Sequence, residues 1–128
     1  MKALTVRQPY AWAILYAGKN IENRSWTTKY RGPLLIHAGA SFNQNPLPHR
    51  LPAPKPDDYF RKAILGEVEL IDIVESSRSR WYEEGSFAWL LADPRPFSTP
   101  ILCKGHLGLW DLSPAEEQAV RRRRRDMK

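Results

Sequence analysis

Short apolar runs, each bounded by glycine or proline, recur along this chain and constrain its fold more than any other feature of its sequence. Apolar and polar residues alternate over 2–7 and again over 21–26, which is typical of strands with one buried face. We predict four further strands: 30–39, ending near His37 and broken at Gly39; 67–75; 86–96, stopped by Pro94; and 105–112. Many short strands and few helices indicate an α+β, mainly β fold, a small and partly closed β-barrel with flanking short helices.

Local signals add helices to these strands. Apolar residues recur at helical spacing over 10–18, and Gly18 provides a stop. A second short helix, capped by Asp57 or Asp58, is expected to extend through Ile64. Ser113, Pro114 and Glu116 match a capping box, so the C-terminal segment is expected to begin as a helix.

The strand at 67–75 changes phase in its middle. Val68 and Leu70 share one side, whereas Ile71 and Ile73 share the other. A bulge between Leu70 and Ile71 would reconcile the two halves on a strongly curved strand.

The length and composition of the chain indicate one folded unit. A chain of 128 residues, 42% of them apolar, closes one hydrophobic core and seldom two. We expect one domain over 1–112, then a basic helix or tail over 113–128, with the prolines of 43–58 forming an extended surface excursion. Cys103 is the sole cysteine, and no stretch is typical of a membrane span or a secretion signal, so we expect a cytoplasmic protein.

The net charge of +6 is unevenly distributed. Residues 1–40 carry six lysines and arginines against one acid, residues 41–120 carry eight against twelve, and residues 121–128 carry six against one. The arginine run at 121–125 is able to meet phosphates, but it is more simply a solvated end. In the N-terminal third the cations alternate with aromatic residues, a mixture suited to phosphates and bases: Tyr10, Trp12, Tyr16, Trp26 and Tyr30.

The segment GKNIENRSW, residues 18–26, places Lys19, Glu22 and Arg24 within six positions. On a strand Glu22 and Arg24 share one face, and Lys19 stands at the junction with the preceding helix. We therefore expect the three charged groups to converge. Such spacing also suits an ordinary solvated or orienting ion pair, so it does not by itself define a ligand site.

The same residues resemble a known family. Gly18, Lys19, Glu22 and Arg24 are similar to the Gly-x-Lys-x-x-Glu-x-Arg signature of the ASCH domains in the PUA-like superfamily, with one residue fewer between glycine and lysine. Other segments in the same order are similar too: VRQPYAWAIL, YRGPLLIHAG, GEVELIDIV, LLADPRP and GHLGLW. The resemblance extends to about Leu112. It implies a curved PUA-like β-barrel, an open cleft lined by the signature block, and binding of RNA or of modified nucleosides.

The resemblance also implies roles for the block. Lys19 and Arg24 would bind phosphate or sugar, while Glu22 would accept hydrogen bonds from a base or ribose and hold Arg24 in place. We expect no cofactor. Lys19→Ala and Glu22→Gln are expected to weaken ligand binding or turnover and to leave the melting temperature nearly unchanged.

Three residues outside the block are further candidates for the ligand site. Gln8 and Trp12 would line the cleft from the start of the helix, although Trp12 at helical spacing fits the core equally well. His37 is a binding candidate at a strand end, where a fully hydrogen-bonded structural histidine is the simpler interpretation.

Two enzymatic alternatives and one non-enzymatic alternative stay open. Some ASCH proteins that this chain resembles are hydrolases of acylated cytidine that use a lysine, a threonine three positions later and a distant glutamate. Lys19 and Glu67 would correspond to the first and last, but Glu22 replaces the threonine, so a glutamate would have to activate water. Others are described as metal-dependent ribonucleases, in which case Glu22 and Glu67 would hold a divalent ion. A protein-interaction adaptor would instead use the proline-rich segment.

Overall fold

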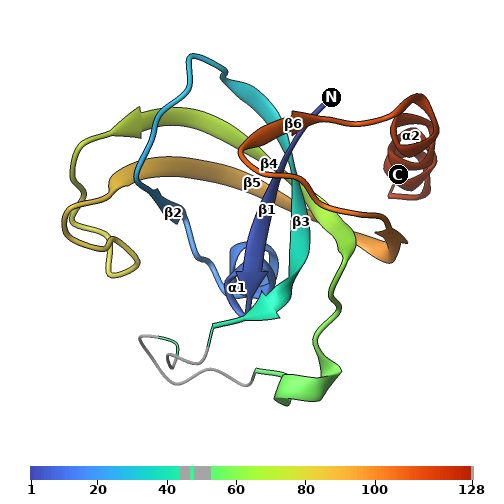
Figure 1. The fold of residues 1–128 in the computed structure, drawn as a ribbon, viewed down its shortest axis with the longest axis horizontal. Helices are drawn as coiled ribbons and strands as arrows, with labels where there is room; N and C mark the ends of the chain where they lie inside the picture. The colour runs from blue at the N-terminus through green and yellow to red at the C-terminus, as the bar shows by residue number, and fades with distance from the viewer. Residues whose placement is uncertain (44–46, 48–52, 128) are drawn as a thin grey trace.

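The computed structural model describes residues 1–43, 47 and 53–127, and this part of the chain forms a six-stranded sheet with two α-helices (Figure 1). The strands are β1 (Lys2–Gln8), β2 (Ile21–Arg24), β3 (Gly32–Phe42), β4 (Ala63–Val74), β5 (Phe87–Leu102) and β6 (Leu109–Asp111). The helices are α1 (Tyr10–Tyr16) and α2 (Pro114–Asp126), and a 3₁₀ turn covers Pro56–Asp58. The predicted α+β, mainly β class is confirmed.

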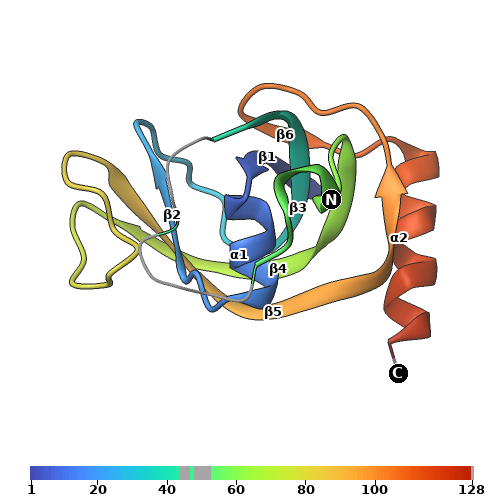
Figure 2. The same cartoon turned by 90° about the horizontal axis from the view of Figure 1, so that it is seen from below.

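The strands follow the order β2-β5-β4-β3-β1-β6. β1 runs parallel to β3, and all the other pairs are antiparallel. Among the described residues no pairing joins the outer strands β2 and β6, which span only four and three residues, so the predicted, partly closed barrel is an open sheet that does not close. The sheet is nevertheless strongly curved, and α1 lies within its curve (Figure 2).

Irregular register bends the long central strands. Between β4 and β5 the pairing shifts at three places, one of them between Leu70 and Asp72, which confirms the predicted bulge after Leu70. The bulge leaves Ile71 57% exposed, whereas Leu70 is buried. At another shift Gly66 lies so close to β5 that a Cβ atom would stand 2.6 Å from the carbonyl oxygen of Arg95. A glycine is therefore required where the two strands bend together.

β5 does not stop at Pro94, as the sequence suggested, but continues to Leu102 through Pro94, Pro96 and Pro100. β2 pairs only with residues 87–90 of β5, so the second half of β5 is an edge on that side. A proline at an edge removes no hydrogen bond from the ladder. The Arg123 side chain of α2 covers part of this edge, with its Nε 2.7 Å from the carbonyl oxygen of Thr99.

Two other sequence-based boundaries are wrong. β3 continues past Gly39 because this glycine is a point of close packing, where a Cβ atom would lie 3.0 Å from Cγ2 of Thr5. The helix expected through Ile64 is only the 3₁₀ turn, since Ile64 pairs with His37 at the start of β4. Much of the proline-rich segment predicted over 43–58 lies outside the described residues.

The two helices pack on different parts of the sheet. α1 packs against β1, β3, β4 and β5, and Gly18 follows its end with φ +73°, as expected for the residue after a helix. α2 packs on β5, where Val120 is fully buried with Leu35, Phe97 and Trp110. The predicted capping box at Ser113 is present. Neither helix in the described part of the chain has the length and apolar character needed to cross a membrane.

Candidate functional site

Lys19, Glu22 and Arg24 converge at the edge strand β2, as their spacing predicts. Glu22 accepts from both cations: its Oε1 lies 2.9 Å from Nζ of Lys19, and its Oε2 lies 3.0 Å from Nε of Arg24. Lys19 and Glu22 are buried, with 4% and 7% of their surface exposed. The three charges therefore form a partly buried cluster and not a solvated surface pair.

The environment of this cluster keeps Glu22 ionised. Burial by itself would raise the pKa of Glu22, but the charges and hydrogen bonds of Lys19 and Arg24 outweigh it and hold the pKa below its ordinary value. The Lys19 ammonium also donates to the carbonyl oxygen of Ile21 and lies 5.5 Å from the centre of the Tyr10 ring. Because its ammonium is engaged by these contacts, Lys19 stabilises the buried cluster and is not free to bind a ligand.

Arg24 is the member of the cluster with capacity left for a ligand. Its Nε and Nη2 are 3.0 Å from the Glu22 carboxylate, and its Nη2 also donates to the carbonyl oxygen of Thr5 at 2.7 Å. Nη1 has no partner among the described residues, and 23% of the side chain is exposed. The guanidinium is thus fixed from one side and open on the other.

A cleft of about 1760 Å³ lies beside the cluster and is lined by Lys19, Glu22 and Arg24. Its other walls come from β1, β3, the hairpin between β4 and β5, and the loop before β6. Seven lysines and arginines line it against two glutamates, Glu22 and Glu83. The aromatic side chains that line it are Tyr10, Trp26, Trp81 and Tyr82. The cleft therefore combines positive charge with flat apolar surfaces.

His37 lines the cleft, but both of its ring nitrogens are engaged. Nε2 lies 2.8 Å from the carbonyl oxygen of Cys103 and therefore carries the proton, which leaves Nδ1 to accept from the Thr5 hydroxyl at 3.2 Å. Burial lowers the pKa of His37, so the ring is neutral at pH 7. The structural interpretation of this histidine fits better than its prediction as a ligand-binding residue.

Gln8 and Trp12 do not line this cleft, contrary to the prediction. The Gln8 side chain is buried, donates to the carbonyl oxygen of Phe60 at 2.8 Å and accepts from the backbone N–H of Trp12 at 2.9 Å. Both residues line a separate hollow of about 270 Å³, together with Tyr16 and Tyr59. Helical spacing placed Trp12 on α1 correctly but gave no information about which hollow the helix faces.

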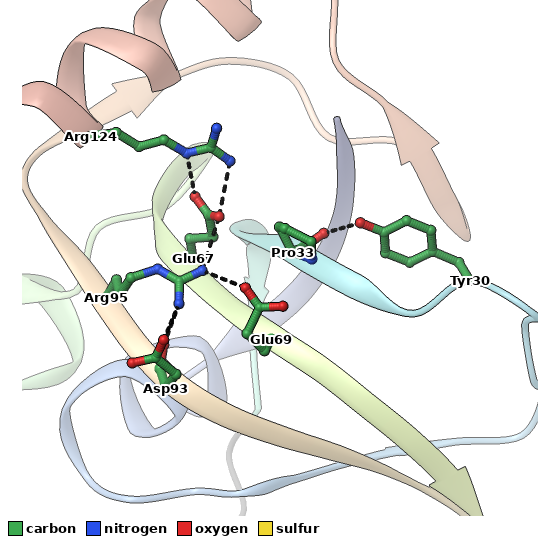
Figure 3. Close-up of polar contacts among 7 residues, drawn as sticks. All are labelled: Tyr30, Pro33, Glu67, Glu69, Asp93, Arg95 and Arg124. Atoms are coloured by element: carbon green, nitrogen blue, oxygen red, sulfur yellow. Dashed lines mark hydrogen bonds and ion pairs between the residues drawn. The ribbon is translucent and has the colours of Figure 1, made fainter.

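Glu67 is also remote from the cluster, although the enzymatic alternatives required it there. It is 3% exposed and accepts from Arg95 Nη2 at 3.0 Å and from Arg124 Nε and Nη2 at 2.9 Å (Figure 3). It does not line the cleft, so its pairing with Glu22 around a metal is wrong. Within the described ranges no group of three or more His, Cys, Asp or Glu residues is arranged to hold a metal ion.

The sequence interpretation missed much of the cleft. Its basic side chains Arg61, Lys62, Arg80 and Lys104 come from three loops that are far apart in the chain. The one local signal was the mixture of arginine and aromatic residues at 80–82, where the Arg80 guanidinium lies 6.0 Å from the Trp81 ring.

The fold and the cleft define the class of protein. A curved, mainly β sheet with a short helix in its curve and a basic cleft beside an edge strand agrees with the PUA-like fold that the motifs of the sequence imply. The sequence model of the ASCH domain matches residues 4–101. This chain belongs to the ASCH domain family, and the resemblance seen in its motifs is confirmed.

Individual relatives agree with this assignment. The chain is 27% identical to human activating signal cointegrator 1 and 28% identical to the mouse protein, over 93% of its own length in both cases. It spans only 23% of the length of these relatives.

Solved structures with a similar fold are known. A point mutant of ZmASCH from Zymomonas mobilis has a TM-score of 0.59 at 19% identity, covering 94% of this chain and 96% of that one. A second structure, of ASCH from the same organism, has a TM-score of 0.52 at 19% identity and covers 91% of this chain and 90% of that one. At this identity the likeness concerns the fold alone.

Proposed function

We propose that this protein binds RNA in the cleft beside the Lys19–Glu22–Arg24 cluster. The observation that carries the proposal is the fixed but incomplete bonding of the Arg24 guanidinium. Its Nε and Nη2 are bonded to Glu22 and to the carbonyl oxygen of Thr5, whereas Nη1 has no partner within the described residues. A guanidinium with a fixed orientation loses little conformational entropy on binding a phosphate. Arg24 is then the phosphate-binding residue, Glu22 positions it, and Lys19 balances the charge of Glu22.

The lining and size of the cleft favour an oligonucleotide. Tyr10, Trp26 and Tyr82 are partly exposed and provide aromatic surfaces for unpaired bases, whereas Trp81 is buried, and the excess of lysine and arginine suits a phosphodiester backbone. The cleft, at about 1760 Å³, exceeds the roughly 300–1,000 Å³ typical of small-molecule pockets. A single modified nucleoside would fill only part of it. The choice of RNA over DNA rests on the ASCH family.

Binding is better supported than hydrolysis. The Lys19 ammonium is engaged by Ile21 and Glu22, and Glu67 belongs to a different ion-pair cluster. The lysine–glutamate arrangement of an amidohydrolase, with Glu67 beside Lys19, is therefore not assembled at the cleft. Among the described residues no group of three or more His, Cys, Asp or Glu residues is arranged to hold a metal ion.

Fluorescence anisotropy with a labelled RNA of about eight nucleotides tests the proposal, since single-strand sites usually span about 4–16 nucleotides. Arg24→Gln is expected to weaken binding by about 10- to 100-fold, the value of one charged hydrogen-bonded contact. Arg24→Lys should recover little, because it keeps the charge and loses the fixed fork. Arg31→Gln is the matched control: this arginine pairs with Asp72 at 3.2 Å and does not line the cleft.

Equal affinity of the wild type and Arg24→Gln would contradict the proposal. If the wild-type protein binds DNA of the same sequence with equal affinity, the cleft is a nucleic-acid site without preference for RNA. Mass spectrometry of RNA and acetylated nucleosides after incubation, with and without divalent metal, separates the alternatives, because a hydrolase yields a new product and a binding module does not.

A further inference from the structure

The five consecutive arginines of α2, Arg121–Arg125, divide into two sets. Arg124 forms the two-point contact with Glu67 through Nε and Nη2, both at 2.9 Å (Figure 3). Arg123 donates to the carbonyl oxygens of Thr99 and Pro100 on β5. These two arginines attach the helix to the sheet and are not available to a ligand.

The other three arginines, Arg121, Arg122 and Arg125, are exposed. Their spacing along the helix places them on one side. Arg121 has only a long contact of 3.5 Å with Glu117, and neither Arg122 nor Arg125 has a side-chain partner among the described residues. The structure thus holds three guanidinium groups in solvent, and among the described residues only Arg121 has an acidic partner, Glu117.

The orientation of this basic face is fixed by the packing of α2. Val120 is fully buried on the opposite side of the helix, and the Ser113 capping box fixes the first turn. The ion pair of Arg124 with the buried Glu67 fixes the last turns. A fully solvated, fraying end would need none of these contacts, so the interpretation as a solvated end does not fit Arg123 and Arg124.

We propose that the exposed arginine face of α2 is a second site for the phosphate backbone, reached by an RNA that also occupies the cleft. This inference rests on the proposed function. β2, which carries Glu22 and Arg24, and α2 lie on opposite sides of α1 in both views (Figures 1 and 2). The loop that contributes Lys104 and His106 to the cleft leads through β6 directly into α2.

The two sites differ in the length of RNA that they require. A compact domain of this size has a radius of gyration of about 14 Å, which corresponds to a diameter of about 36 Å. At about 3.4 Å per stacked nucleotide, a strand needs roughly eleven nucleotides to cross it. An acidic protein would also be attracted to three arginines, but a continuous phosphodiester backbone explains both basic surfaces with one ligand.

The experiment compares a short RNA of about eight nucleotides with a long one of about twenty, over salt concentrations of about 50 to 200 mM. The variant Arg121→Gln/Arg122→Gln/Arg125→Gln removes the exposed face. The charge-matched control is Lys29→Gln/Lys55→Gln/Arg78→Gln, three exposed cations that lie outside both α2 and the cleft. Circular dichroism and the melting temperature show whether α2 stays folded in each variant.

For the long RNA, the α2 variant is expected to reduce the slope of log affinity against log salt by about 2, because each lost single-strand phosphate contact contributes about 0.7. Its affinity for the short RNA should stay within about twofold of wild type, and the control should change neither slope. An unchanged slope for the α2 variant, or an equal change in the control, would overturn the proposed site on α2 and leave the proposed RNA site in the cleft unaffected. If the binding of long RNA requires the α2 arginines but not Arg24, the proposed site in the cleft is wrong and the basic face of α2 binds RNA without it.

Discussion

Glu22→Gln is the substitution whose effect on stability the structure predicts most sharply. The amide keeps one acceptor for Lys19 or Arg24 but removes the negative charge between them. Lys19 is only 4% exposed, so its ammonium would be left buried without a counter-ion. Removing one partner of a buried ion pair costs about 3–5 kcal/mol.

The contacts that remain in the variant reduce this cost. The Lys19 ammonium keeps its hydrogen bond to the carbonyl oxygen of Ile21 and can still donate to the amide oxygen at position 22, so the loss is expected not to reach the top of this range. We therefore expect Glu22→Gln to lower the free energy of unfolding by about 3–4.5 kcal/mol, equivalent to a fall in melting temperature of roughly 10 °C or more.

Urea denaturation followed by tryptophan fluorescence measures this loss. Glu69→Gln is the matched control: Glu69 lies 3.0 Å from Arg95, its side chain is 33% exposed, and Arg95 keeps Glu67, so the expected cost is below about 1 kcal/mol. The double variant Lys19→Met/Glu22→Gln should regain much of the stability, because it no longer buries an unpaired ammonium. A loss below about 1 kcal/mol for Glu22→Gln would refute the reasoning.

Three further predictions concern pH, the thiol and α2. Because the pKa of Glu22 is lowered in the folded state, its contribution to stability is complete above the unfolded pKa of about 4.3 and is lost as pH falls through the folded pKa. The difference in unfolding free energy between wild type and Glu22→Gln should accordingly be constant near neutral pH and shrink in acid. Burial, with a smaller effect of Glu116, raises the pKa of Cys103 to about 11, so its alkylation by iodoacetamide at pH 8 should be about 100-fold slower than in urea-unfolded protein. A rate equal to that of the unfolded chain would contradict this. Arg124→Gln removes the two-point contact with Glu67 and should speed hydrogen exchange throughout α2, whereas Arg122→Gln should not. Equal exchange in the two variants would show that the ion pair does not hold the helix.

Patterns within a few residues predicted the local structure well. The convergence of Lys19, Glu22 and Arg24 follows from the strand period, and the bulge after Leu70 follows from a change of phase along one strand. The capping box at Ser113 is likewise a short-range signal. Each of these depends on backbone geometry that neighbouring residues determine.

Burial and long-range neighbours were not predictable in this way. Spacing indicated that Lys19 and Glu22 could be replaced without loss of stability, but the structure buries both, which is why we now expect the opposite. Glu67 was grouped with Glu22 by chemistry alone, whereas strand pairing places it beside Arg95. Pro94 was interpreted as a stop because the sequence does not show that β2 pairs with only the first residues of β5.

The proline-rich half of β5 has a consequence for behaviour at high concentration. Its prolines lack N–H donors, and Arg123 already donates to the carbonyl oxygens of Thr99 and Pro100. This edge of β5 therefore offers few free backbone hydrogen-bonding groups to a strand from another molecule. The domain thereby resists intermolecular sheet formation and aggregation along this side. Truncation before α2 would uncover those oxygens together with the apolar surface beneath Val120, and the shortened protein is expected to self-associate.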